Sequence, residues 1–89
     1  MGWRPAVAPE LSSALVSVGC PRDGPEHCAL AENGIVDLVD LLTLQESVLS
    51  GFRYMDPRRG GYHLLNEVEK RRIMSLVRWV RDNMQDGQG

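Results

Sequence analysis

The chain has 89 residues, of which 43% are apolar and 25% charged, and its formal net charge is −2. These values are typical of one folded domain and exclude wholesale disorder. No apolar run approaches the roughly 20 residues that a membrane-spanning helix needs, so we expect no membrane span. Aromatic residues are few, which leaves the core to Leu, Val, Ile and Met and favours helices packed on helices.

We expect residues 1–8 to be irregular and a first helix to cover residues 9–18. Pro9 suits the first turn of a helix, and the apolar residues that follow have helical spacing. Gly19 can cap the C-terminal end of this helix. Asp-Gly and Gly-Pro pairs then predict a loop over residues 20–33.

Two cysteines lie in this loop. Cys20 and Cys28 enclose a turn-rich segment that a disulfide could close, and closure would stabilise a small domain by roughly 2–3 kcal/mol. Free thiols, or a metal role shared with His27, are the alternatives. Zinc needs four ligands, and the other histidine, His63, lies far away in the sequence.

A second helix is predicted over residues 37–50, with Asp37 in its first turn and Gly51 as its stop. Its apolar stripe is interrupted once, at Gln45. Pro57 and two glycines then indicate a loop as far as Tyr62.

The third and longest helix is predicted over residues 64–84, followed by an irregular tail at 85–89. Together these elements predict an all-α fold for residues 1–89: a small three-helix domain with two ordered loops. The expected core consists of apolar residues from all three helices: Leu15, Val18, Leu38, Leu41, Leu42, Val48, Leu49, Leu65, Val68, Ile73, Leu76, Val77 and Val80.

Two segments share the frame of a twelve-residue calcium loop, which has glycine at position six and an acid at position twelve. Gly34 precedes Asp40 by six residues, and Gly61 precedes Glu67 by six. The other plausible calcium ligand is Asn33 in the first frame and Asp56 in the second. Each loop thus retains two plausible ligands where calcium takes six to eight, so we predict no metal site.

The stretch Asn-Gly-Ile-Val-Asp-Leu-Val-Asp-Leu-Leu-Thr-Leu-Gln over residues 33–45, closing at Leu-Ser-Gly over residues 49–51, resembles a dockerin repeat. The resemblance covers under half of the chain and implies a degenerate pair of calcium loops. Dockerins bind cohesin domains, so it also implies a calcium-dependent docking module. The chain departs from the dockerin pattern at Ala29, Ala31, Arg58 and Gly60, where the family places acidic calcium ligands.

Charge is distributed unevenly. Residues 1–52 contain two basic and seven acidic residues, a net charge of −5, whereas residues 53–89 contain eight basic and five acidic residues, a net charge of +3. The basic third helix, beginning at Lys70-Arg71-Arg72, makes a small nucleic-acid-binding regulator one alternative function. Its glutamates and the acidic overall charge weigh against that alternative. No serine, histidine or glycine motif points to catalysis or to a bound cofactor.

We therefore expect a non-enzymatic protein–protein interaction module or a small subunit of a complex. Aromatic and arginine side chains anchor protein interfaces more often than other residues do. Several of them exceed what three helices need for a core. The predicted partner-binding residues are Phe52, Tyr54, Arg58, Arg59, Tyr62 and Trp79.

Overall fold

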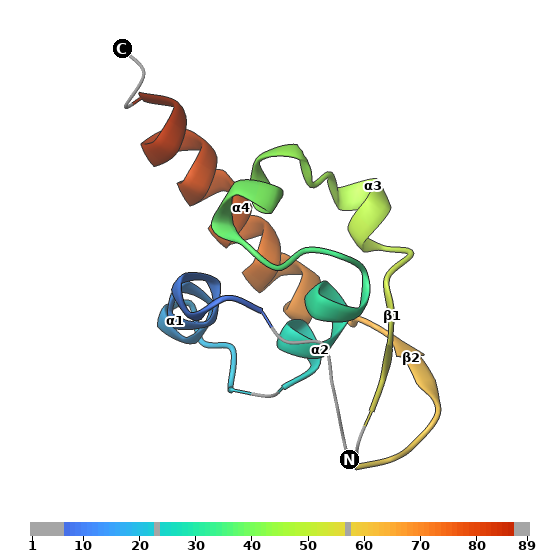
Figure 1. Cartoon of the computed structure of the whole chain (residues 1–89). Helices are drawn as coiled ribbons and strands as arrows, with labels where there is room; N and C mark the ends of the chain where they lie inside the picture. The colour runs from blue at the N-terminus through green and yellow to red at the C-terminus, as the bar shows by residue number, and fades with distance from the viewer. Residues whose placement is uncertain (1–6, 23, 57, 87–89) are drawn as a thin grey trace.

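The computed structural model describes residues 7–22, 24–56 and 58–86, and their side chains as far as residue 83. Its elements follow in the order α1 (Pro9–Ser17), α2 (Pro25–Glu32), the 3-10 helix η1 (Leu38–Thr43), α3 (Glu46–Leu49), β1 (Arg53–Met55), β2 (Tyr62–Leu64) and α4 (Glu67–Asp86) (Figure 1). The all-α prediction is wrong, because the described residues include an antiparallel hairpin of β1 and β2 and more than three helices.

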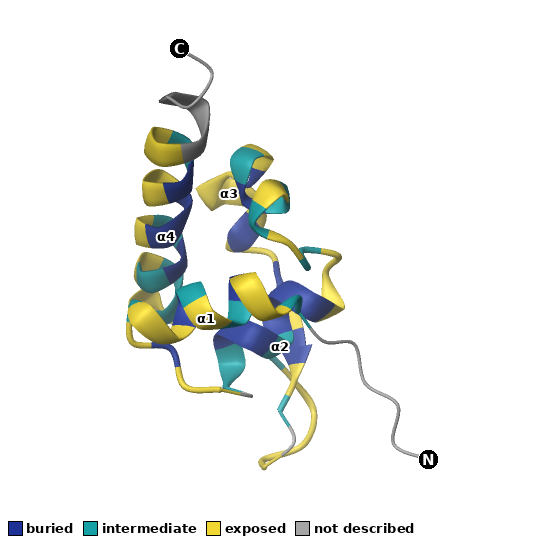
Figure 2. Ribbon diagram, turned by 60° about the vertical axis from the view of Figure 1, so that its left-hand side comes forward, coloured by how far each residue is buried: buried dark blue, intermediate teal, exposed yellow. Residues whose placement is uncertain are grey.

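The long helix α4 organises the domain. It packs against α1, α2, η1 and α3, and the hairpin lies beside α2 near the N-terminal end of α4. As far as residue 83, one side of α4 is buried against these elements and the opposite side is exposed (Figure 2). None of the helices among the described residues is long and apolar enough to cross a bilayer.

The helix predicted over residues 9–18 is confirmed as α1. Gly19 ends it with φ +99°, a left-handed conformation that glycine adopts without strain. The Gly19 N–H donates to the Val16 carbonyl and the Cys20 N–H to the Leu15 carbonyl, at 3.0 and 2.9 Å. This pairing is the Schellman arrangement that commonly closes helices.

The loop predicted over residues 20–33 is wrong, because α2 occupies its second half. Pro25 lies at the start of α2, and Gly34, at φ +86°, closes the helix with a second Schellman pair. Helix α2 has two turns and little amphipathic contrast, since it buries Glu26 and His27 beside its apolar residues. Apolar periodicity therefore does not predict α2.

The helix predicted over residues 37–50 is interrupted. Leu44 and Gln45 are extended, with ψ of 128° and 152°, and they separate η1 from α3. The break changes which side chains face the core. Leu44, outside the predicted stripe, is buried, whereas Val48, inside it, is 51% exposed.

The helix predicted over residues 64–84 begins later, at Glu67, because residues 62–64 form β2. Asn66 and Glu69 form a reciprocal capping box: the Glu69 N–H donates to Asn66 Oδ1 and the Asn66 N–H to Glu69 Oε1, both at 2.8 Å. Helix α4 also includes residues 85 and 86 of the predicted irregular tail. Residues 1–6 and 87–89, also predicted irregular, lie outside the described residues.

The core lies between α4 and the other elements. Of the predicted core residues, those on α4 other than Val68 are buried, as are Leu15, Leu41, Leu49 and Leu65. Val18, Leu38 and Leu42 are half-buried, and Val48 and Val68 are exposed. Sequence reasoning missed the remaining core residues: Leu11, Cys20, Ala29, Leu30, Ala31, Leu44, Phe52 and Tyr54.

Candidate interaction surface

The hairpin divides its side chains between two faces. Cα partners are Arg53 with Leu64, Tyr54 with His63 and Met55 with Tyr62. Because side chains alternate along a strand, the central pair faces the domain and the two outer pairs face away from it. Tyr54 is accordingly buried and His63 half-buried, with their rings 6.2 Å apart.

Three large apolar side chains lie on the outer face of the hairpin. Met55, Tyr62 and Leu64 are 42%, 66% and 57% exposed. Arg53, opposite Leu64, completes this face. We call these four residues the hairpin face.

Phe52 and Tyr54, two of the predicted partner-binding residues, do not lie on the surface. Phe52 is 7% exposed and Tyr54 2%, and both belong to the core. Burial raises the pKa of the Tyr54 phenol, and the nearby Glu69 carboxylate adds to this shift. Strand β1 packs against α2, and this contact buries both aromatic side chains. The predicted three-helix fold had no strand at this position, so it left both side chains on the surface.

Arg58, Arg59 and Tyr62 are exposed and lie on the hairpin or in its loop. Trp79 is 54% exposed, but it lies on α4, twelve residues after Glu67. At 1.5 Å per residue this places it roughly 18 Å along the helix. The predicted residues therefore do not form one surface.

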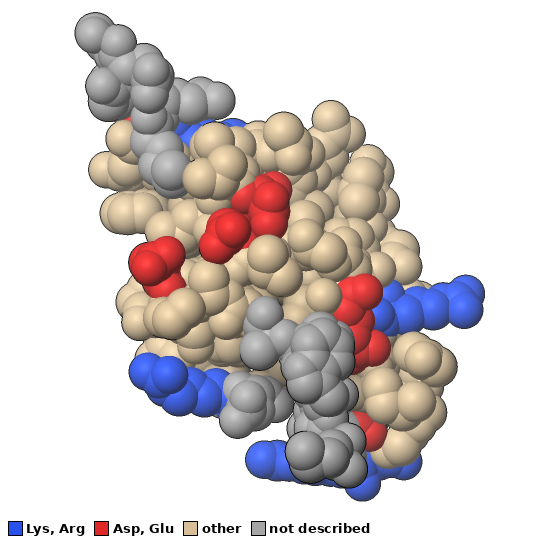
Figure 3. All heavy atoms as spheres, viewed as in Figure 1, with Lys and Arg blue, Asp and Glu red and all other residues tan. Residues whose placement is uncertain are grey.

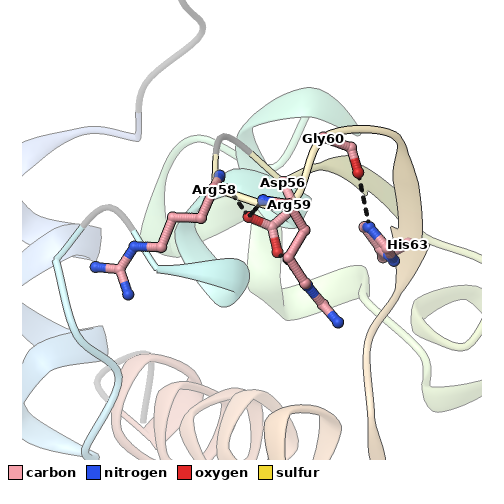
Figure 4. A network of polar contacts seen from close by, with 5 residues as sticks. All are labelled: Asp56, Arg58, Arg59, Gly60 and His63. Atoms are coloured by element: carbon pink, nitrogen blue, oxygen red, sulfur yellow. Dashed lines mark hydrogen bonds and ion pairs between the residues drawn. The ribbon is translucent and has the colours of Figure 1, made fainter.

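Asp56 organises the hairpin loop (Figure 4). Its Oδ1 accepts the N–H groups of Arg58 and Arg59, at 2.8 and 3.2 Å, and its Oδ2 accepts Arg59 Nε at 2.8 Å. These bonds, led by that from the Arg59 side chain, lower the pKa of Asp56 to about 2. His63 Nε2 donates to the Gly60 carbonyl at 3.0 Å.

The Arg58 side chain points away from this network. It lines a cavity of about 150 Å³ between the hairpin and the connection from α1 to α2. Arg22 and Tyr54 line the same cavity. The loop thus holds one arginine against Asp56 and directs the other toward this cavity.

Asp40, Asn33 and Asp56 of the calcium-loop frames bond to the protein's own backbone, and Glu67 pairs with the Lys70 side chain. Asp40 Oδ2 accepts the N–H groups of Val36 and Asp37 at 3.0 and 3.1 Å. Asn33 Nδ2 donates to the carbonyls of Ala29 and Arg53 at 2.8 and 3.0 Å. Among the residues that the structure describes, no three His, Cys, Asp or Glu side chains gather as a metal site would require.

Most basic residues of α4 also have partners within the domain. Lys70 pairs with Glu67 at 2.9 Å. Arg81 donates to the carbonyls of Leu42 and Leu44 at 3.2 and 2.7 Å. Arg72 pairs with Glu26. These contacts hold α4 against its neighbours and occupy donor groups of Lys70, Arg72 and Arg81 that could otherwise bind phosphates.

Side chains of α1, α2 and α4 form a polar cluster in which Glu26 and His27 are buried. The Glu26 carboxylate is 1% exposed, and Arg72 Nη1 lies 3.4 Å from its Oε2. Burial and the nearby Glu26 carboxylate raise the pKa of Cys20 to about 12, so this thiol stays protonated and unreactive at neutral pH. No disulfide joins Cys20 to Cys28. Ser12 Oγ and His27 Nε2 lie 3.1 Å apart, a contact that no sequence motif indicated.

Comparisons of the chain with models of protein families, with curated protein sequences and with solved structures gave no match. The surface itself therefore carries the functional inference.

Proposed function

We propose that this chain is a non-enzymatic protein–protein interaction module, or a small subunit of a complex, that contacts its partner through the hairpin face. The observation that supports this proposal is the exposure of Met55, Tyr62 and Leu64 side by side on one face of a short sheet.

Packing of the core does not require apolar residues at these three positions. Residues on the inner face of the same hairpin are buried or half-buried, so the alternation of the strands already satisfies the fold. Polar residues could occupy the outer face without loss of packing. Contiguous exposed apolar side chains of this kind mark interaction sites in folded proteins.

The chemistry of the hairpin also suits an interface. Tyr and Arg are enriched among the residues that contribute most to binding, because both combine apolar surface with hydrogen-bonding groups. Tyr62 lies on the hairpin face, and Arg58 extends from the adjoining loop.

A nucleic-acid-binding regulator and a calcium-dependent docking module stay predictions. A salt-sensitive shift of duplex DNA would favour the first, since neutralised phosphates release counterions. Calcium-dependent capture of a protein partner would favour the second.

The proposal is tested by selecting binders from a displayed library of random linear peptides on the immobilised domain. The test variant is Tyr62→Ser with Leu64→Ser. The matched control is Val39→Ser with Val48→Ser, which removes two valines of 58% and 51% exposure outside the hairpin. We expect enriched peptides to bind the test variant at least tenfold more weakly and the control within twofold of the parent chain. Absence of enrichment, or equal losses in both variants, would contradict the proposal.

A further inference from the structure

We infer that the outer edge of β2 takes an extended, acidic segment of a partner protein as a third antiparallel strand. This inference rests on the proposed function and specifies its partner. Such strand addition is a recurrent mode of peptide recognition, in which backbone hydrogen bonds supply affinity and side-chain contacts supply specificity.

The outer edge of β1 is closed. The Met55 N–H donates to the Glu32 carboxylate, at 3.1 Å to Oε2, and the Arg53 carbonyl accepts Asn33 Nδ2 at 3.0 Å. Both partners come from the C-terminal end of α2. A further strand therefore cannot pair with β1.

The register assigns the hydrogen-bonding direction of every hairpin residue. Since the peptide groups of Arg53 and Met55 point toward α2, those of Tyr54 point toward β2 and pair with His63. The bond from the Asp56 N–H to the Gly61 carbonyl, at 3.1 Å, continues this alternation. The peptide groups of Tyr62 and Leu64 consequently point away from β1.

No group within the described part of the chain bonds to this side of Tyr62 or Leu64. The outer edge of β2 lies on the side of the hairpin away from α2 (Figure 1), and the side chains of both residues are exposed. An open edge of this kind is a template for another strand. An antiparallel strand would exchange N–H and C=O bonds with both residues, and its side chains opposite them would lie on the hairpin face. Valine or isoleucine at those alternate positions would cover Tyr62 and Leu64.

The charge of the hairpin indicates whether the added strand comes from a second copy of this chain or from a different protein. Residues 53–64 contain three arginines and one acid, so the hairpin carries a net charge of +2 with His63 neutral. Asp56 is already engaged by Arg59, and among the residues that the structure describes no acid forms an ion pair with Arg53 or Arg58. Basic side chains project at the lower end of the molecule in Figure 3, where Figure 1 places the hairpin loop. Pairing two such edges would bring like charges together, whereas an acidic segment complements them.

The probe is a synthetic peptide with valine at alternate positions and glutamate at both ends, titrated into the full chain by calorimetry and by amide NMR. We expect binding with shifts concentrated at Tyr62 and Leu64. Replacing the terminal glutamates by lysines should weaken binding at least tenfold at low salt. N-methylation of one valine that faces Tyr62 should also weaken it about tenfold, the effect of one lost hydrogen bond. N-methylation of the intervening residue, whose N–H points away from β2, should change affinity less than twofold.

Equal effects of the two N-methylated peptides would overturn strand addition. If displayed peptides still bound in a manner sensitive to Tyr62→Ser with Leu64→Ser, the proposed function would stand without it. Sedimentation that shows a dimer in which the Tyr62 and Leu64 amides are protected, with no binding of the acidic peptide, would overturn the inference in favour of pairing between two copies. Stronger binding of the lysine-ended peptide would overturn the acidic assignment.

Discussion

Tyr54 and Arg58 offer the sharpest test of the fold. Both were predicted to lie on a contact surface, but the structure buries Tyr54 and exposes Arg58. Tyr54 is 2% exposed within the core, whereas Arg58 is exposed in the hairpin loop. Replacing a buried aromatic residue by alanine costs about 3–5 kcal/mol, from lost burial and from the cavity that remains. A domain of this size has a total free energy of unfolding of roughly 4–13 kcal/mol. Tyr54→Ala should therefore remove a large part of the stability.

The measurement is urea unfolding followed by far-UV circular dichroism, with the slope m as a check on two-state behaviour. In thermal unfolding followed by the same signal, Tyr54→Ala should lower the melting temperature by about 12 °C or more, since 1 kcal/mol corresponds to roughly 4–8 °C at this size. Tyr54→Phe keeps the ring and should cost no more than about 1.5 kcal/mol. Arg58→Ala should stay within about 0.5 kcal/mol of the parent chain. A cost below about 1 kcal/mol for Tyr54→Ala, at unchanged m, would refute the placement of this ring in the core.

Three further predictions concern charged and titrating groups. Arg72→Met should destabilise the domain by about 2 kcal/mol in urea unfolding, because it leaves the buried Glu26 carboxylate without its ion pair. The expected cost is below that of a fully buried pair because the Arg72 side chain is 40% exposed. The cost should be smaller when Glu26→Gln is also present. The raised pKa of Cys20 predicts a contribution to stability that is complete below pH 9 and lost as pH rises from 9 to about 12, so the Cys20→Ala variant should lack that part of the pH dependence of unfolding. The lowered pKa of Asp56 predicts the opposite sign, with stabilisation of the loop above about pH 4 that is lost as pH falls through about 2. NMR titration should find the Asp56 midpoint near 2 in the parent chain, and a midpoint closer to 3.8 with Arg59→Gln.

Helices α1 and α4 were predictable because each shows apolar residues at helical spacing, although only α1 has clear signals at both ends. Pro9 and Gly19 mark the ends of α1, and the buried residues Ile73, Leu76, Val77 and Val80 recur at helical spacing along α4. Periodicity says less about where a helix is interrupted. Gln45 was visible as a polar residue in an apolar stripe, but its extended backbone follows from packing η1 and α3 separately against α4.

The hairpin could not be predicted because its strands have three residues each and contacts outside them supply much of its support. Glu32 and Asn33 close one edge of β1, although each precedes its partner by twenty residues or more. Such contacts join segments that no local pattern connects. The same limit explains the misassignment of Tyr54, whose burial depends on α2.

The glycine-and-acid spacing that resembles paired calcium loops also has a local explanation in turn chemistry. Gly34 adopts the left-handed conformation that ends α2, and Asp40, six residues later, accepts the backbone N–H groups that precede η1. Gly61 adopts the same conformation in the hairpin loop, which Asp56 holds in place. A helix end or a tight turn needs a glycine at positive φ, and an acid nearby satisfies N–H groups that the turn leaves unpaired. In the first frame these two needs alone account for a glycine and an acid six residues apart. In the second frame the acid at this spacing, Glu67, instead pairs with Lys70 at 2.9 Å in the first turn of α4. The spacing from Gly61 to Glu67 therefore follows from the length of β2 and of its connection to α4, and it needs no shared set of metal ligands.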